Sequence, residues 1–341
     1  MKNYFKHIGF ILLSMSLLAG CSAGSSKAAT TPPPGVTETA LKLNEGTQWE
    51  LDARLTIPSG ATGPVPAVVL VHGSGPSDMN ETIGACAPFR DLAYGLSKRG
   101  IAVLRFNKRT LTYASQIANS LESFTAREES ADDAVAAVKL LRADPRIDKT
   151  CIIGIGHSLG ATLIPRIDAA GADFDAMVLL AGTPRPLWEV SYDQNMALLE
   201  QYPAEKRASL EKQINDELEK AKQLSGMSDS EAKQLTVFGM PGYYLKDLAK
   251  YLPQDLLLQN TKPVLILQGT ADFQVSPEKD YRLFQTALKG RPNTAFKLYD
   301  GLNHLFIKSD GPNKGSVKEY QTPGNVDEKV LNDIANWILS L

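Results

Sequence analysis

Gly156-His157-Ser158-Leu159-Gly160 follows a β-leaning apolar run over residues 151–155 and precedes a small-residue, helix-compatible run over residues 161–164. This context predicts a tight turn between a strand and a helix that exposes the serine hydroxyl as a nucleophile. The flanking glycines let the helix approach the strand without Cβ clashes. An ordinary glycine turn is the alternative, and the nucleophile interpretation requires a base and an acid elsewhere in the chain.

Length and composition are those of an ordinary globular protein. The chain has 341 residues, of which 43% are hydrophobic and 22% charged, so it can bury a large core. Its formal net charge is −2, which gives no indication of a nucleic-acid partner. Because the histidine and cysteine spacing suits no zinc site, we expect neither a metal nor a cofactor.

The first residues are typical of an export signal. Lys2 and Lys6 precede an apolar run over residues 8–18, and the sequence Leu18-Ala19-Gly20 then leads to Cys21. This pattern predicts a bacterial lipoprotein signal peptide over residues 1–21, with Cys21 lipidated, for example by palmitate. An ordinary secretory signal or a signal anchor is the alternative. Either way we expect an exported protein, held by its lipid on a bacterial membrane and facing outside the cytoplasm.

Residues 22–38 are rich in Ser, Ala, Thr and Pro and predict a disordered tether between the lipid and the folded body. The two remaining cysteines are Cys86, in an expected loop, and Cys151, at the start of an expected strand. An oxidising compartment permits a disulfide, but two cysteines do not define a framework, and we expect free thiols.

The rest of the chain alternates strand and helix patterns. A hairpin is expected over residues 40–57. The expected strands are 65–71, 101–106, 151–155, 176–181, 264–267 and 295–299, and the expected helices include 89–98, 130–142 and 327–341. Apolar strands that alternate with helices predict an α/β domain over residues 39–341, with a mostly parallel central sheet flanked by helices.

The alternation stops between residues 184 and 258, where no convincing strand pattern is found. Apolar residues at near-helical spacing mark a charged segment here, and Ser228 with Glu231 form a possible capping box. We therefore expect a helical cap that is inserted between two strands and lies over the sheet.

A base for Ser158 follows by elimination. The chain has four histidines: His7 lies in the signal peptide, His72 follows an early strand, and His157 sits within the turn, where its side chain should point away from the serine. His304 lies in a loop after the last expected strand, and we expect it to be the base.

The acid is expected in the loop after strand 264–267, where Asp272 follows the carboxyl end of the strand. Asp280 should fall on the next helix, and Asp300 is a rival because it is close to His304 in sequence. The resulting order, Ser158, Asp272, His304, is the order of the α/β-hydrolase fold.

Two backbone N–H groups should bind the oxyanion. One is that of Leu159, at the amino end of the helix. The second should come from the turn after strand 65–71, where Ser74 is the first choice and Gly73 the neighbouring option. A plain glycine turn is the alternative there.

Four segments together resemble one family. They are His72-Gly73-Ser74-Gly75-Pro76 with Asp78, the turn around Ser158, Gln268 through Val275, and Leu302-Asn303-His304-Leu305-Phe306. These segments look like bacterial α/β-hydrolases of the dienelactone-hydrolase-like, prolyl-oligopeptidase-related carboxylesterase group, over about residues 41–341. The resemblance implies metal-independent hydrolysis of carboxylic esters under a small helical cap. Such sequences often carry a Tyr-Asp-Lys-Arg-Gly type turn where this chain has Phe106-Asn107-Lys108-Arg109-Thr110.

The substrate pocket is the least defined part of the site. Its candidate residues are His72, Trp188, Tyr243, Tyr244 and Phe273, for which core packing between cap and sheet is an equally good interpretation. Lys108 and Arg109 could meet an anionic substrate group, but we favour a solvated loop or a salt bridge.

The sequence thus predicts an extracytoplasmic serine esterase that acts on small-molecule esters through an acyl-enzyme. Three alternatives stay open: a peptidase or aminoacyl hydrolase on the same triad, a cell-envelope acyltransferase, and a non-catalytic binding lipoprotein. The pattern leaves the oligomeric state undefined.

Overall fold

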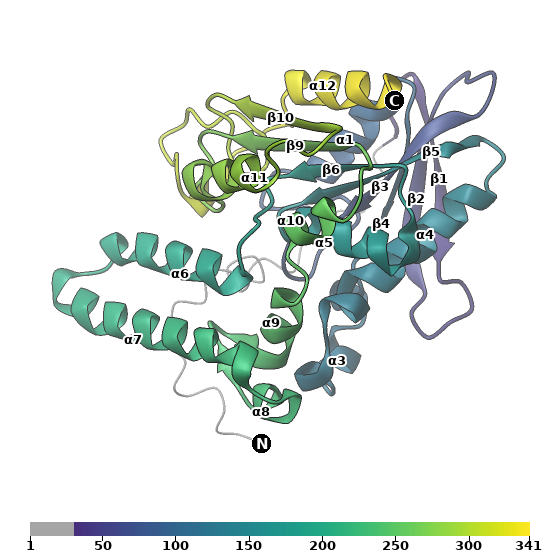
Figure 1. Ribbon diagram of the computed structural model, residues 1–341. Coiled ribbons are helices and arrows are strands. Elements are labelled where there is room, and N and C mark those ends of the chain that lie inside the picture. The colour runs from purple at the N-terminus through teal and green to yellow at the C-terminus, as the bar shows by residue number, and fades with distance from the viewer. Residues whose placement is uncertain (1–30) are drawn as a thin grey trace.

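A computed structural model describes residues 31–341 of the chain (Figure 1). The predicted signal peptide, Cys21 and most of the predicted tether lie outside the described residues. Within the described part, eight strands form one sheet in the order β1-β2-β4-β3-β5-β6-β9-β10. The strands of this sheet are β1 (Val36–Leu43), β2 (Leu51–Pro58), β3 (Val65–Val71), β4 (Ala102–Phe106), β5 (Ile147–His157), β6 (Ala176–Leu180), β9 (Val264–Gly269) and β10 (Thr294–Tyr299).

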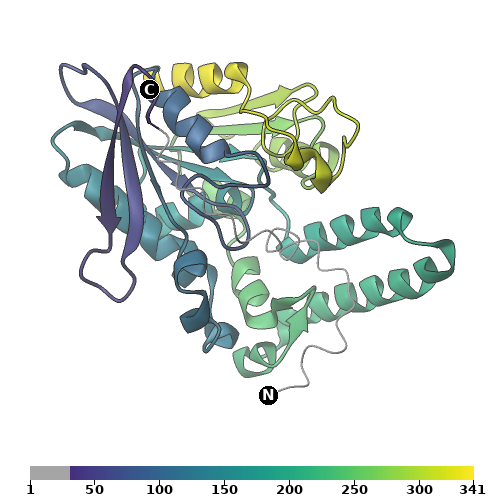
Figure 2. The ribbon, with the colours of Figure 1, turned by 180° about the vertical axis from the view of Figure 1, so that it is seen from behind.

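The sheet is mostly parallel, as predicted. Strand β2 pairs antiparallel with β1 and with β4, and every other pairing in the sheet is parallel. The hairpin of β1 and β2 forms one edge and is seen from behind in Figure 2. Strand β1 begins at Val36, so the end of the segment predicted as tether, 22–38, belongs to the sheet. This part of the prediction was wrong because Val36 lies on the buried side of the hairpin.

Helices cover both faces of the sheet (Figure 1). Their bounds are α1 (Pro88–Ser97), α4 (Asp132–Ala143), α5 (Leu159–Ile167), α11 (Arg282–Ala287) and α12 (Glu328–Leu339). Two short helices, α2 (Arg109–Thr112) and α3 (Ala114–Ile117), follow β4. Val68 and Leu70 of β3 pack into the core under α1 and α12, while Val69 and Val71 pack into the core under α4 and α5. Successive side chains of a strand point to opposite faces, so both sets are buried and the central strands show no polar alternation.

The cap is inserted between β6 and β9, which are neighbours in the sheet. It consists of α6 (Leu187–Leu198), α7 (Ala204–Gln223), α8 (Asp229–Lys233), α9 (Gly242–Ala249), α10 (Pro253–Leu258) and the short strands β7 (Thr236–Val237) and β8 (Met240–Pro241). Helices α6 and α7 lie side by side and project away from the sheet in both views (Figures 1 and 2).

The insertion is mainly helical, as predicted, but α6 and α7 project away from the sheet where the prediction placed the cap over it. Strands β7 and β8 were not predicted, because a two-residue antiparallel pair leaves too short a pattern to detect. The capping box is present: the Ser228 side chain accepts from the Glu231 N–H, and the Glu231 carboxylate accepts from the Ser228 N–H. Helix α8 therefore begins where its sequence signal places it.

The turn at Ser158 depends on a very close approach of α5 to the sheet. A Cβ atom on Gly160 would lie 2.1 Å from the carbonyl oxygen of Val71 in β3, and one on Gly156 would lie 2.3 Å from the backbone of Gly160. Ser158 between them has φ +55° and ψ −120°, a strained conformation for a residue with a side chain.

Replacing Gly160 with Ala should destabilise the fold by about 3 kcal/mol or more, because the new methyl group meets backbone and has no side chain to displace. Chemical denaturation measures the change. Gly63→Ala is the control, since a Cβ there has no atom within 4 Å. Equal stabilities for the two variants would contradict the close approach.

Candidate active site

Ser158 lies at the carboxyl end of β5 and immediately before α5, with its N–H donating to the carbonyl of Leu180 in β6 (2.8 Å). Its side chain lines a cavity of about 340 Å³, to which His304 also contributes. The loops that surround the cavity follow β3, β5, β6, β9 and β10. Functional groups of open α/β sheets gather at this edge, because parallel strands end there together.

Asp272 and His304 are in contact, although 32 residues separate them. The His304 Nδ1 lies 2.7 Å from Oδ2 of Asp272, and both side chains are buried. The other oxygen of Asp272 accepts the N–H groups of Gln274 and Val275, at 2.8 and 2.9 Å. A carboxylate fixed in this way holds a proton on Nδ1 and leaves Nε2 of the imidazole for proton transfer.

The two rival aspartates have other partners. Asp280 is fully buried and bonds to Thr183 and Arg185. Asp300 lies at the surface, where it accepts a bond from the Thr270 hydroxyl (3.1 Å). Of these three aspartates, Asp272 is the one that the structure places against the His304 ring.

The structure distinguishes among the three N–H groups that the sequence offers as oxyanion donors. The N–H of Gly73 donates to Oε1 of Glu81 (2.7 Å) and is therefore unavailable to a substrate. Ser74 and Leu159 both line the cavity beside Ser158. Leu159 is the first residue of α5, so its N–H has no acceptor within the helix and is free to bind an anion.

Glu81 is a buried residue that the sequence did not point to. It has φ +50°, and its Oε2 lies 2.9 Å from Nδ1 of His157. The other ring nitrogen of His157 contacts the carbonyl oxygen of His304 at 2.9 Å. His157 thus points away from the Ser158 side chain, as expected, but joins the loop of His304 to Glu81.

The charge state of this pair follows from its surroundings. Burial lowers the pKa of His157, but the negative charge of Glu81 and the contact with it outweigh burial and raise that pKa above its usual value. Burial raises the pKa of Glu81, and the His157 charge with the other polar contacts reverses this and lowers it. The two groups form a buried ion pair at the wall of the cavity.

None of the five pocket candidates lines the cavity, which corrects the prediction. His72 contacts the rings of Phe89 and Phe106, and its Nε2 lies 2.9 Å from the carbonyl oxygen of Asp78. Trp188 is buried in the core. These aromatic side chains pack inside the protein because contact with sheet and helices removes more apolar surface from water than a pocket would.

The other three candidates are also engaged elsewhere. Tyr243 lies under the ammonium group of Lys233, and the Tyr244 hydroxyl donates to Glu129. Phe273 stacks on the ring of Tyr320, with 5.9 Å between centroids. Tyr320 itself lines the cavity, so Phe273 supports the wall from behind.

Apolar side chains from distant segments form much of the cavity wall. They are Ile83, Leu187, Val190, Met240, Val275, Val317 and Tyr320. These residues come from the loop after β3, from the cap, from the acid loop and from a turn near the carboxyl terminus. Sequence reasoning missed them because isolated apolar residues in loops carry no pattern.

Lys108 and Arg109 form salt bridges, but the loop that carries them is not solvated. Lys108 pairs with Glu129 (2.6 Å) and Arg109 with Asp133 (2.6 Å), and all four side chains are almost completely buried. Neither cation lines the cavity. Of the two favoured interpretations, the salt bridge is therefore confirmed and the solvated loop is wrong.

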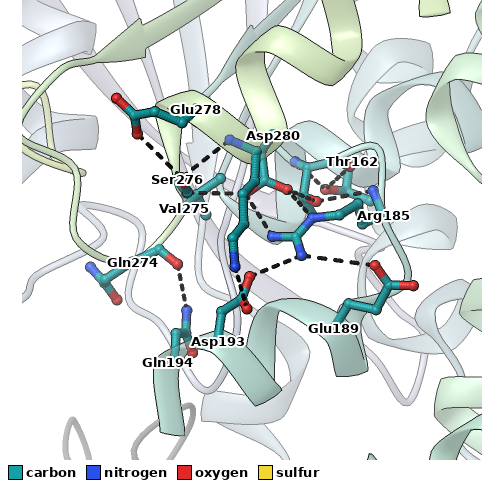
Figure 3. Close-up of polar contacts among 12 residues, drawn as sticks. Thr162, Arg185, Glu189, Asp193, Gln194, Gln274, Val275, Ser276, Glu278 and Asp280 are labelled. Atoms are coloured by element: carbon teal, nitrogen blue, oxygen red, sulfur yellow. Dashed lines mark hydrogen bonds and ion pairs between the residues drawn. The ribbon is translucent and has the colours of Figure 1, made fainter. Parts of the chain in front are cut away.

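The cap is fastened to the domain beside the acid loop (Figure 3). Arg185, just before α6, bonds to both oxygens of the buried Asp280 and also to Asp193 on α6. Gln194 on α6 donates to the carbonyl of Gln274 (2.9 Å). Because the N–H of Gln274 bonds to Asp272, the position of the cap is linked to the acid of the site.

Other expectations concern cysteines and metals. Cys86 and Cys151 are free thiols, as predicted. Within residues 31–341 no group of three His, Cys, Asp or Glu side chains is arranged to hold a metal ion. No helix in the same part of the chain is both long and apolar enough to cross a membrane.

Comparison with known proteins identifies the family. Residues 68–311 match the alpha/beta hydrolase family, and the chain belongs to it. Esterase EstD of Thermotoga maritima is 40% identical over 289 residues, which cover 85% of this chain and 65% of that relative. The chain therefore spans about two thirds of the relative's length.

Solved structures show the same fold. Est1E from Butyrivibrio proteoclasticus superposes with a TM-score of 0.56 at 16% identity, over 89% of this chain and 99% of Est1E. A puromycin-hydrolyzing peptidase of Mycobacterium tuberculosis superposes with a TM-score of 0.55 at 17% identity, over 92% of this chain and 40% of the peptidase.

The buried His72 gives the fold a pH dependence. Burial lowers its pKa from 6.5 to about 4, so the unfolded chain takes up this proton first as the pH falls. The stability that neutral His72 contributes is complete above pH 6.5 and is lost between pH 6.5 and 4. We expect the free energy of unfolding, measured in urea, to fall between neutral pH and about pH 4.5. This fall should be about 2 kcal/mol larger in the wild type than in His72→Asn. Equal losses would contradict this assignment.

Proposed function

We propose that this protein is a serine esterase that hydrolyses small-molecule carboxylic esters. The carrying observation is the shared cavity: Ser158 and His304 line it, and Asp272 holds the far side of the imidazole at 2.7 Å. The relative named as an esterase, at 40% identity, supports the same reaction. A cavity of about 340 Å³, whose wall combines aliphatic and polar side chains, fits a small acyl or alcohol group.

The reaction proceeds through an acyl-enzyme. Oγ of Ser158 attacks the ester carbonyl carbon while Nε2 of His304 takes the hydroxyl proton, and Asp272 stabilises the imidazolium. The N–H groups of Ser74 and Leu159 bind the oxyanion of the tetrahedral intermediate. The C–O bond then breaks, and the alcohol leaves with the proton from His304. Water, deprotonated by His304, attacks the acyl-enzyme and releases the carboxylic acid and the free serine.

Ser158→Ala should lower kcat/KM for short p-nitrophenyl esters by about 10³-fold or more, because it removes the nucleophile. Fluorophosphonate labelling, present in the wild type, should disappear. Asp272→Asn and Asp300→Asn form a matched pair of loop aspartates: the first should lose about 10²- to 10⁴-fold in kcat, and the second should keep it. Full turnover by Ser158→Ala would refute the mechanism.

A substrate panel separates this function from its alternatives. Faster cleavage of aminoacyl amides than of acyl esters would indicate a peptidase or aminoacyl hydrolase and contradict the esterase assignment. Acyl transfer to added alcohols that outruns hydrolysis would indicate an acyltransferase. If the folded wild type neither reacts with fluorophosphonate nor turns over any acyl compound, the result would indicate a non-catalytic binding lipoprotein.

We also propose that the enzyme is exported and anchored through a lipid on Cys21, on the strength of the residues before that cysteine. Wild type expressed in bacteria should incorporate labelled palmitate and partition into detergent, and Cys21→Ser should do neither. Palmitate incorporation by Cys21→Ser, or none in the wild type, would contradict the anchor.

A further inference from the structure

The oxyanion loop after β3, residues 73–77, is held from behind by buried charges. The N–H of Gly73 donates to the carboxylate of Glu81 (2.7 Å), and the carbonyl of Gly73 accepts from Nζ of Lys108 (2.7 Å). Both peptide groups that flank Gly73 are therefore fixed by an ionic side chain. Gly73 itself lies against Ser158, since a Cβ on Gly73 would be 3.1 Å from the Ser158 Cβ.

The loop that carries Lys108 positions its side chain for the contact with the carbonyl of Gly73. Its N–H donates to the carbonyl of Ser77 (2.9 Å), and the Asn107 side chain accepts from the N–H of Met79 (2.9 Å). The loop that follows β4 thus holds the oxyanion loop through backbone bonds and through the Lys108 ammonium group. That group is almost completely buried and lies 2.6 Å from Oε1 of Glu129.

The bond to Lys108 determines where the next N–H points. The carbonyl of Gly73 and the N–H of Ser74 belong to the same planar trans peptide group, so they point in opposite directions. Because the carbonyl is drawn inward to Lys108, the Ser74 N–H is directed to the other side, where Ser74 lines the cavity with Ser158.

A cation at the carbonyl end also strengthens the N–H as a donor. It draws electron density toward the carbonyl oxygen and leaves the Ser74 hydrogen more positive, and this effect is large where water is excluded. We propose that Lys108 is a positioning residue of the oxyanion hole, which orients and polarises the Gly73–Ser74 peptide for transition-state binding. This inference rests on the proposed esterase function.

The cap completes the arrangement. The hydroxyl of Tyr244, on α9, donates to the second oxygen of Glu129. Burial and the charge of Glu129 raise the pKa of Tyr244 well above its usual value, so this hydroxyl keeps its proton. A line of contacts therefore runs from the cap through Tyr244, Glu129 and Lys108 to the oxyanion loop.

Lys108→Met tests the proposal, with Arg109→Met as the matched control. Both residues are buried cations of one loop with a carboxylate partner, but Arg109 contacts Asp133 and not the oxyanion loop. For a short p-nitrophenyl ester we expect Lys108→Met to lower kcat about 10- to 100-fold with KM changed less than about threefold. Arg109→Met should keep kcat near the wild-type value, even if it lowers the unfolding temperature as much.

A transition-state analogue separates positioning from general damage. A trifluoromethyl ketone forms a tetrahedral oxyanion on Ser158, so its affinity for Lys108→Met should fall by the same factor as kcat/KM. Lys108→Arg, which keeps the charge, should recover part of both losses. Unchanged kcat, or analogue affinity unchanged while kcat falls, would overturn the proposal.

Tyr244→Phe gives a second test that does not depend on the folding of Lys108→Met. Removing this hydroxyl should lower kcat several-fold at constant KM, and wild-type kcat in a folded Tyr244→Phe would overturn the line of contacts. A wild type that lacks both ester turnover and fluorophosphonate labelling would refute the esterase function itself. An active wild type with a fully active Lys108→Met would refute only the role of Lys108.

Discussion

The site depends on one steric constraint, the contact of helix α5 with the sheet at two glycines. No side chain separates Gly160 from the carbonyl of Val71, and none separates Gly156 from the helix backbone. This contact lets the chain turn sharply at Ser158 and places the amino end of the helix at the floor of the cavity. The packing of β3, β5 and α5 maintains the strained backbone conformation of Ser158, and the stability of the whole core offsets the energy of that strain.

Two pairs of buried charges support the loops around the cavity. The pair Glu81–His157 joins the oxyanion loop to the carbonyl of His304, and the pair Lys108–Glu129 joins the same loop to the cap. Buried ion pairs contribute little net stability, because desolvation offsets their attraction. Their value here is geometric: each pair fixes a loop at the cavity. Glu81 and His157 also line the cavity, whereas Lys108 and Glu129 lie behind its wall.

The proposed nucleophile, base and acid could be selected from the sequence because each is marked locally. Ser158 lies in a glycine pattern between strand and helix, four histidines limit the choice of base, and Asp272 directly follows a buried strand. The five aromatic pocket candidates failed for the opposite reason. Residue type alone does not distinguish an aromatic side chain in the core, such as Trp188, from one at a cavity wall, such as Tyr320.

The amino-acid sequence by itself determined the α/β order, the inserted cap and the residue types available for catalysis, because strand, helix and turn patterns depend on neighbouring residues. Only the tertiary structure decided which N–H groups face the cavity and which side chains wall it. The N–H of Gly73 donates to Glu81 and does not face the cavity, and the Lys108 side chain points inward and donates to the carbonyl of Gly73. These choices depend on partners that are far apart in the chain, and only the folded sheet brings such partners into contact.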